Sequence, residues 1–385
     1  MRDLLIGVAV TAVVTLPLAV LGATAPLLRA DLGLGEAAFG GLVALFFLSG
    51  AVVSIPAGPV SRTIGLRPMI LASCATTLVC LAVISGWVGS WWPLAIALLA
   101  AGMANSTGQV AVNQWLTQHR PADRQGLAFG AKQAAVPLAV LSAGILLPLV
   151  VVPNGWRAGY LAAGAISLAG LLAVWWLTGR APRISREGID RRRLSFSRPV
   201  IMLSIVGVLG SAGGTCLSPF LVDYVTSRDL GIEAAGILLV IGAAAGIVAR
   251  VLAGFAADRL QIGPLTIMRT LLGGGAVGIA FFALGITGVA WVPAVVLAFA
   301  GAWGWAGLLP FALARIAPAE FASGVGMIVM AQLTGAVVGP ALFGALVEGS
   351  GYPVAWTVLV GFVGTAALLT VAVGPRSPAP VPATG

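Results

Sequence analysis

Two basic residues, Lys132 and Arg250, lie inside apolar stretches where a charge is costly. Lys132 is the only lysine among the 385 residues and sits in the segment GLAFGAKQAAVP, residues 126–137. Each cation lies eight residues from the nearest polar boundary, Arg124 for Lys132 and Asp258 for Arg250. At about 1.5 Å per helical residue, both would lie roughly 12 Å inside an apolar layer. An ionisable group at such a depth marks a functional site unless it finds a partner.

No Asp or Glu lies in the middle of any apolar stretch, so the sequence offers these cations no obvious acidic partner. Two unpaired positive charges repel each other and lose water, and a small anion between them would relieve both costs. Arg250 could hold a carboxylate through two hydrogen bonds, while Lys132 would add a point charge. Two alternatives stay open: the ammonium of Lys132 could reach the cytoplasmic interface along its apolar stem, and Arg250 could brace a loop through Asp258.

Polar and aromatic residues accompany the two cations. Asn105, Gln109 and Asn113 step by four and therefore share one face of a helix, which should turn away from lipid and either line a cavity or bond a neighbouring helix. Trp303 and Trp305 lie near the middle of an apolar stretch and would form a pocket wall or pack on neighbouring glycines. The candidate substrate-binding residues are Lys132, Arg250, Asn105, Gln109, Asn113, Gln133, Trp303 and Gln332.

The elements that carry these residues are apolar segments of membrane-spanning length. Hydrophobic residues make up 59% of the chain and charged residues 9%, with a mean hydropathy of +1.05. Stretches of about twenty apolar residues indicate helices that cross a bilayer. We therefore predict an all-α polytopic membrane protein with twelve spanning helices, near residues 4–28, 37–61, 67–88, 93–117, 126–151, 157–178, 199–225, 233–257, 264–286, 290–314, 321–347 and 353–373.

The distribution of arginine predicts the orientation of these helices. Most arginines outside the apolar stretches fall on one side, and the other side receives Arg29, Arg157 and Arg228. By the positive-inside rule, both termini should lie in the cytoplasm, with the protein in a bacterial inner membrane. The net charge of +9 is thus explained by topology, and we expect no nucleic-acid partner. The three cysteines all fall inside spans, so we expect no metal or cofactor. We also expect a monomer.

The chain divides into two similar parts. We expect a first six-helix bundle over residues 1–178, a cytoplasmic linker over 179–198, a second bundle over 199–373 and a Pro-rich disordered tail over 374–385. Residues of the first part recur at a constant offset of 196, as in the pair Gly50 and Gly246. A duplicated six-helix unit is typical of secondary transporters, whose binding site lies between the two units near the bilayer midplane.

A loop motif identifies a family. The segment GFAADR, from Gly254 to Arg259, resembles the loop motif of the major facilitator superfamily, in which Asp-Arg follows a glycine by four residues. The first copy, GPVSRTIGLR at residues 58–67, keeps both glycines and the final arginine but has Arg62 and Thr63 in place of Asp and Arg. The resemblance covers all twelve spans and implies two six-helix bundles that rock around a central cavity.

The surroundings of the two cations resemble those of anion carriers within this superfamily. Gly246, Arg250 and Gly254 follow the spacing of the helix-eight arginine of monocarboxylate and nitrate-type carriers, where that arginine meets the anionic group of the substrate. The corresponding residue of the first half is Ser54, so one arginine of a paired clamp is missing. The segment KQAAVP at 132–137 is similar to helix five of cyanate-transporter-like members.

Charged residues near the helix ends are candidate gates. The resemblance implies that Arg29 and Asp223, at the outer ends of helices one and seven, meet when the outside is closed. Asp223 is also the candidate carrier of a coupled proton. Asp258 and Arg259 belong to the inner loop motif and are expected to act in gating.

We therefore expect a secondary active transporter that moves a small carboxylate or inorganic anion by alternating access. One alternative is an efflux carrier for amphipathic or drug-like compounds, although such carriers tend to place an acid in the cavity. A second alternative is a non-transporting membrane sensor or membrane-embedded enzyme. We expect no enzyme, because the sequence gathers no catalytic cluster in the apolar layer.

Overall fold

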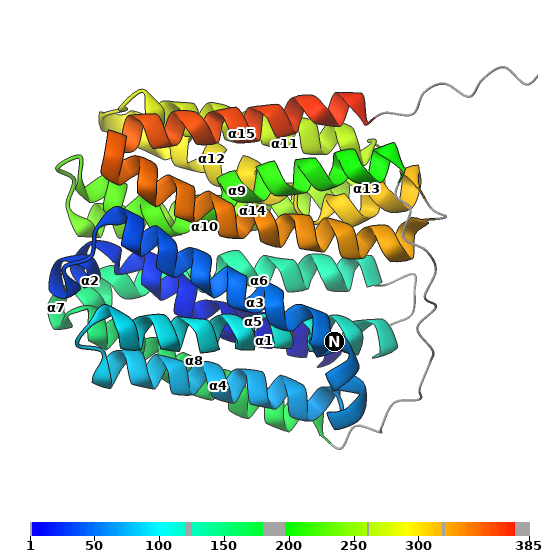
Figure 1. The fold of residues 1–385 in the computed structure, drawn as a ribbon, viewed down its shortest axis with the longest axis horizontal. Helices are drawn as coiled ribbons and strands as arrows, with labels where there is room; N and C mark the ends of the chain where they lie inside the picture. The colour runs from blue at the N-terminus through cyan, green and yellow to red at the C-terminus, as the bar shows by residue number, and fades with distance from the viewer. Residues whose placement is uncertain (1, 120–124, 180–196, 260–261, 318–319, 374–385) are drawn as a thin grey trace, which may run out of the picture.

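The computed structural model describes residues 2–119, 125–179, 197–259, 262–317 and 320–373, and this part of the chain is helical, without strands (Figure 1). Most of the expected linker and the whole expected tail, residues 374–385, lie outside the described residues. The elements are α1 (Arg2–Ala23), α2 (Ala25–Leu32), α3 (Glu36–Ile64), α4 (Leu66–Trp87), α5 (Trp91–His119), α6 (Gln125–Leu146), η2 (Leu147–Val151), α7 (Val152–Asn154), α8 (Trp156–Thr178), α9 (Arg198–Thr226), α10 (Ile232–Arg259), α11 (Pro264–Ala283), η3 (Gly288–Ala290), α12 (Trp291–Gly304), α13 (Leu308–Ile316), α14 (Phe321–Ser350) and α15 (Tyr352–Ala372).

Eleven helices of the described part are long and apolar enough to cross a membrane, and the bent pair α12 and α13 makes up to twelve. The all-α, multi-pass prediction is thus confirmed, and the predicted spans coincide with the observed helices to within a few residues. Two predicted helices are interrupted. Residues 4–28 form α1 and the start of α2, and residues 290–314 form α12 and α13, which meet at 43°.

A proline follows each interruption by two or three residues. Pro26 and Pro310 lack an N–H and their rings exclude the carbonyl of the residue four positions earlier, which is Gly22 in the first case and Ala306 in the second. The helix therefore ends before each proline and restarts at or near it. The second break, at residues 305–307, lies directly beside Trp303, so it bears on the candidate site.

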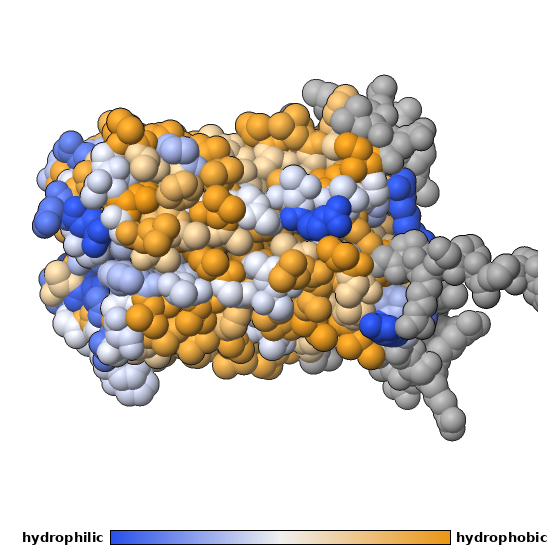
Figure 2. Space-filling model, turned by 90° about the horizontal axis from the view of Figure 1, so that it is seen from above, coloured by the Kyte–Doolittle hydropathy of each residue, from blue (hydrophilic) through white to orange (hydrophobic). Residues whose placement is uncertain are grey.

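The helices run roughly alongside one another in two groups (Figure 1). We call α1 to α8 the N-half and α9 to α15 the C-half. We call the end where α1 begins and α15 ends the inner end, after our prediction from the positive-inside rule that it faces the cytoplasm. The opposite end, with α2 and α7, is the outer end. Figure 2 shows a broad apolar band along the molecule, with hydrophilic residues gathered at the outer end. This band is the surface expected to face lipid.

Glycines let the backbones of the two halves approach closely toward the outer end. A Cβ at Gly22 of α1 would lie 2.8 Å from Cα of Pro219 in α9. A Cβ at Gly40 of α3 would lie 3.1 Å from Cα of Gly344 in α14. At Gly144 of α6 it would lie 2.9 Å from a side-chain carbon of α10. Small residues at such crossings permit dense helix packing within a membrane.

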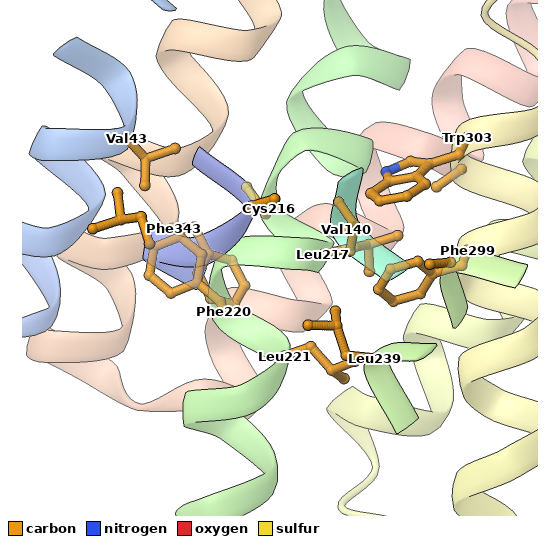
Figure 3. Packing of buried hydrophobic residues seen from close by; sticks show 14 of the residues in the cluster. Val43, Val140, Cys216, Leu217, Phe220, Leu221, Leu239, Phe299, Trp303 and Phe343 are labelled. Atoms are coloured by element: carbon orange, nitrogen blue, oxygen red, sulfur yellow. The ribbon is translucent and has the colours of Figure 1, made fainter. Parts of the chain in front are cut away.

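Aromatic side chains fill the space between these crossings. Phe220 of α9 lies 5.4 Å from Phe39 of α3 and 4.6 Å from Phe343 of α14, measured between ring centroids. Figure 3 shows Phe220 beside Phe343, with Val43 of α3 across from them, and Val140 of α6 next to Leu217 of α9. We call this buried contact between the halves the outer seal. The side chains of the outer seal are buried.

Candidate functional site

Lys132 is buried in the N-half, with 4% of its surface exposed. It lies on α6, and its ammonium donates a hydrogen bond of 2.9 Å to Oδ1 of Asn113 on α5. No ion pair joins Lys132 to a carboxylate within the described residues. The partner of the Lys132 side chain among the described residues is therefore a neutral amide, and the terminal nitrogen has further N–H groups that could bind another partner.

Arg250 lies on α10 and reaches across the boundary between the halves. Its Nη1 donates to the backbone carbonyl of Gln133 on α6, and its Nε donates to the carbonyl of Trp303 on α12 at 3.0 Å. The guanidinium carbon is 5.9 Å from the Trp303 ring centroid. No carboxylate pairs with Arg250 among the described residues, so its charge is met by neutral dipoles and an aromatic face.

The two cations lie at neighbouring positions of one interface. Gln133 directly follows Lys132, so the guanidinium of Arg250 touches the backbone one residue from the buried lysine. The structure shows the backbone carbonyl of Gln133 as a partner of Arg250, and the role of Gln133 as a substrate ligand stays a prediction. Arg250 of the C-half thus contacts α6 at the residue next to Lys132, and neither cation has a carboxylate partner among the described residues.

The break between α12 and α13 supplies one of these carbonyls. The last four carbonyls of a helix lack partners within it, and Arg250 satisfies that of Trp303. Nε1 of Trp303 donates to the carbonyl of Gly214 on α9 at 2.8 Å, which fixes the indole at the site. Trp305 behaves differently, because it is fully buried and packs on Gly210, where a Cβ would clash with its ring. Of the two tryptophans, Trp303 is the one beside the cation.

The polar stripe of α5 meets the site at one end. Asn113 accepts the bond from Lys132. Oδ1 of Asn105 and Oε1 of Gln109 are buried and accept no hydrogen bond from the described residues, although buried polar atoms usually have a partner. Gln332 of α14 packs beside Gly207 of α9, and no hydrogen bond within the described part joins it to the other candidates.

A second charged cluster, which we call the outer latch, closes the outer end. Arg29 of α2 forms an ion pair with Asp223 of α9 and another, 2.7 Å long, with Glu36 of α3. Its Nε also donates to the carbonyl of Leu34 at 3.1 Å. The hydroxyl of Tyr352 on α15 donates to Asp223 at 2.8 Å. Only 13% of the Arg29 side chain and 10% of the Asp223 side chain are exposed.

The electrostatics of the outer latch favour the charged arginine. Burial by itself would lower the pKa of Arg29, but the negative charges of Asp223 and Glu36 more than offset it, so the pKa is raised. The sequence pointed to Arg29 and Asp223 and missed Glu36 and Tyr352. Charged and phenolic residues at helix ends are common at membrane interfaces, so their types alone gave no signal.

A further contact between the halves lies next to the outer latch. The carboxylate of Glu348 on α14 accepts a hydrogen bond of 2.9 Å from the backbone N–H of Ala37. Ala37 lies in the first turn of α3, where a carboxylate also complements the helix dipole. The side chains of Asp258 and Arg259, the other expected gating residues, lie outside the described side chains, and their role stays a prediction.

A third charged group lies entirely within the N-half at the outer end. Asp31 accepts hydrogen bonds of 3.0 Å from Nε1 of Trp156 and from Nη1 of Arg157. These donors, that of Trp156 first, lower the pKa of the Asp31 carboxyl below its usual value. The guanidinium of Arg157 also stacks 4.2 Å from the Trp156 ring centroid. This pair joins α2 to α8 and makes no link between the halves.

Solved structures with the same fold are membrane transporters. The crystal structure of a D-xylose-proton symporter superposes with a TM-score of 0.80 and 14% identity, covering 97% of this chain and 98% of that one. The nucleoside transporter NupG, solved as a mutant, gives a TM-score of 0.75 and 15% identity, covering 97% and 99%. At such low identity these matches establish the fold alone.

Sequence relatives agree with this fold. A gallate transporter of Pseudomonas putida is 26% identical over 165 residues, which cover 43% of this chain and 36% of that protein. An uncharacterized MFS-type transporter of Mycobacterium tuberculosis is 26% identical over 286 residues, covering 71% and 61%. The chain thus spans less than two thirds of the length of these curated relatives. The family model described as Major Facilitator Superfamily matches residues 7–314, and the chain therefore belongs to this superfamily of membrane transporters.

Proposed function

We propose that the protein is a secondary active transporter that moves a small anion across the membrane by alternating access. The observation that carries the proposal is the pair of cations at the boundary of the halves, Lys132 and Arg250, which meet only neutral partners among the described residues. A carboxylate is a better partner for both groups than an amide or a backbone carbonyl, because its negative charge attracts the two cations in addition to accepting their hydrogen bonds.

The positions of the two cations suit alternating access. Lys132 belongs to the N-half and Arg250 to the C-half, so an anion held by both would link the halves. In this structure the outer seal and the outer latch join the halves on the outer side of the site. Substrate binding and outer closure therefore involve different residues of the same boundary, which is what a rocking motion around a fixed site requires.

An organic carboxylate is our preferred substrate class. The relative from Pseudomonas putida is named a gallate transporter, and gallate is an aromatic carboxylate that carries three hydroxyl groups. Hydroxyl groups are hydrogen-bond donors, and the amide oxygens of Asn105 and Gln109 are buried acceptors without a donor among the described residues. These amides share a face of α5 with Asn113, the partner of Lys132. Trp303 would offer its ring to an aromatic or apolar portion of the substrate.

Asp223 is our candidate for a coupled proton. A proton on this carboxylate would cancel the charge that attracts Arg29 and would weaken the outer latch. Uptake of a proton from outside would then favour opening toward the outside. Transport of the anion should in that case depend on a pH gradient in proteoliposomes.

The proposal is tested by the thermal stability of the purified protein with benzoate, gallate, nitrate and cyanate. We expect one anion class to raise the melting temperature of the parent but not of Lys132→Met or Arg250→Met. Loss of one partner of a buried charge pair costs about 2–5 kcal/mol, so each variant should bind at least about thirtyfold more weakly. Arg228→Gln is the matched control, because this arginine also bonds a carbonyl, that of Gly285, but outside the site.

Two outcomes would contradict the proposal. If none of the anions stabilises the parent, or if both methionine variants respond as the parent does, the two cations are structural. Efflux of a neutral or amphipathic compound would then become the leading function. Counterflow of the stabilising anion in proteoliposomes would separate transport from binding alone.

A further inference from the structure

An apolar groove lies on the N-half between the inner halves of α4 and α8. Its volume is about 480 Å³. The residues that line it are all apolar: Leu71, Ala72, Ala75, Leu171, Leu172 and Trp175. Small alanines on α4 face larger side chains on α8, which leaves a depression parallel to the helices. Trp175 is 57% exposed at its edge, so the groove opens onto the surface that faces lipid.

Two arginines lie just beyond the inner end of this groove. Arg67 precedes Leu71 by one turn of α4, and its Nε donates 3.2 Å to Oγ1 of Thr178, which follows Trp175 by one turn of α8. Arg2 approaches the same end of α8 from α1, and its Nε donates to the carbonyl of Leu177. Both guanidinium groups are thus positioned through Nε over the end of the groove.

The Nη nitrogens of these two arginines form no hydrogen bond with another described residue. No ion pair or further side-chain hydrogen bond involves Arg2 or Arg67 in that part of the chain. Asp3, the acidic neighbour of Arg2, is engaged by Nε1 of Trp115 at 3.1 Å. At the outer end, Arg29 and Arg157 are each paired with a carboxylate, and Arg228 donates to the carbonyl of Gly285. Within the described part of the chain, no carboxylate pairs with either arginine of this inner pair.

We propose that this groove and the two arginines form a binding site for an anionic phospholipid of the inner leaflet. One acyl chain lies in the groove along α4 and α8, and the phosphate accepts hydrogen bonds from Arg67 and Arg2. The order of the groups matches a lipid, because the apolar groove lies toward the bilayer centre and the guanidinium groups toward its surface. Guanidinium binds phosphate through paired N–H groups, and the cytoplasmic leaflet is the anionic one. The proposal does not depend on the transported substrate.

The aromatic residues at the same depth support this placement. Trp175 borders the groove, and the next residue, Trp176, is also exposed. Tryptophan side chains favour the level of the lipid headgroups. The phosphate of a lipid in the groove would therefore lie near the depth at which Arg67 and Arg2 are held.

The test is native mass spectrometry of the full chain with equal amounts of palmitoyl-oleoyl phosphatidylglycerol and phosphatidylcholine. A basic residue near a membrane surface adds about 1 kcal/mol of attraction to an anionic lipid, which corresponds to about fivefold in affinity. We expect the parent to retain phosphatidylglycerol preferentially and Arg67→Gln to reduce this preference about fivefold. Ala75→Trp should fill the groove and reduce retention of both lipids. The matched control for the arginine variant is Arg269→Gln, at an inner-end arginine of the C-half. The matched control for the groove variant is Val79→Trp, at an exposed position of α4.

Three results would overturn the proposal. Equal retention of the two lipids by the parent would show that the arginines do not select charge. Unchanged lipid retention in both Arg67→Gln and Ala75→Trp would place any lipid elsewhere. Loss of bound phosphatidylglycerol upon addition of sodium phosphate would indicate a site for free phosphate. Arg2→Gln carries the same expectation as Arg67→Gln and replaces it if that variant does not fold, since Arg2 is exposed.

Discussion

Replacing Arg29 with glutamine should open the outer end of the protein much more often than in the parent. Arg29 is the only cation of the outer latch within the described residues, and it holds both Asp223 of the C-half and Glu36 of the N-half. Without it, Asp223 keeps the hydroxyl of Tyr352 as its hydrogen-bond donor. A carboxylate that is 10% exposed would then lie in the closed outer end without a counter-charge.

The magnitude follows from this burial. Truncating one partner of a buried, hydrogen-bonded charge pair costs about 2–5 kcal/mol, mostly because the other charge is left unpaired. The cost falls on the closed conformation, since an open outer end would return Asp223 to water. Even about 2 kcal/mol would raise the ratio of open to closed molecules about thirtyfold. Asp223→Asn should have a smaller effect, because Arg29 would retain Glu36 at 2.7 Å and the carbonyl of Leu34.

Cysteine accessibility measures this opening directly. Val43 is fully buried in the outer seal, so Val43→Cys in a background without the three native cysteines should react with a membrane-impermeant maleimide only when the outer end opens. We expect the labelling rate to rise most with Arg29→Gln and less with Asp223→Asn. Arg157→Gln is the control, because it breaks an exposed ion pair at the same end within the N-half. Labelling of Arg29→Gln at the parental rate would refute a latch. Faster labelling of Asp223→Asn than of Arg29→Gln would refute the argument that an unpaired Asp223 costs more than an Arg29 that keeps Glu36.

Three further predictions concern single contacts. A Cβ at Gly22 would lie 2.8 Å from Cα of Pro219, so Gly22→Ala should raise the labelling rate of the same reporter, whereas Gly41→Ala, whose Cβ meets no atom within 4 Å, should not. The pKa of Asp31 is lowered, so its contribution to stability is present above its usual pKa of 3.8 and is lost as the pH falls through the lowered value. Melting temperatures measured between about pH 3 and 6 should therefore depend less on pH for Asp31→Asn than for the parent. Trp303→Phe removes the 2.8 Å bond to a backbone carbonyl and should cost about 1–3 kcal/mol in chemical unfolding, and an unchanged midpoint would contradict that role.

Hydropathy was sufficient to locate the helices, but it did not locate their breaks. The windows at 4–28 and 290–314 are continuous in apolar character, so they predicted single helices. The chain breaks at Thr24 and at residues 305–307 because Pro26 and Pro310 remove hydrogen bonds and exclude the preceding carbonyl. Prolines within a span do not always have this effect, since Pro17 lies inside the continuous α1. Local packing decides whether a proline breaks the helix or lies within it, and that packing is not visible in the sequence.

The candidate site was predictable where a side-chain type was rare at its position. A lone lysine and a lone arginine in apolar stretches identified Lys132 and Arg250, and the residues beside them gave Gln133 and Trp303. What the sequence could not indicate is that Gln133 and Trp303 contribute backbone carbonyls to Arg250. Every residue has a carbonyl, so its use depends on helix crossing and on the break after α12. The sequence therefore could indicate the residues at this boundary but not which of their atoms contact Arg250.

The carbonyls around Arg250 connect anion binding to movement of the two halves. A ligand shifts a conformational equilibrium only by as much as its affinity differs between the conformations. With the outer end closed, Nη1 of Arg250 is bonded to Gln133 across the boundary, and an anion must compete with that carbonyl for the guanidinium. Any conformation that separates α6 from α10 would remove the competitor and leave Arg250 free to bind. Under the proposed function, the hydrogen bond from Arg250 to Gln133 is therefore the contact through which a bound anion would favour one conformation over the other.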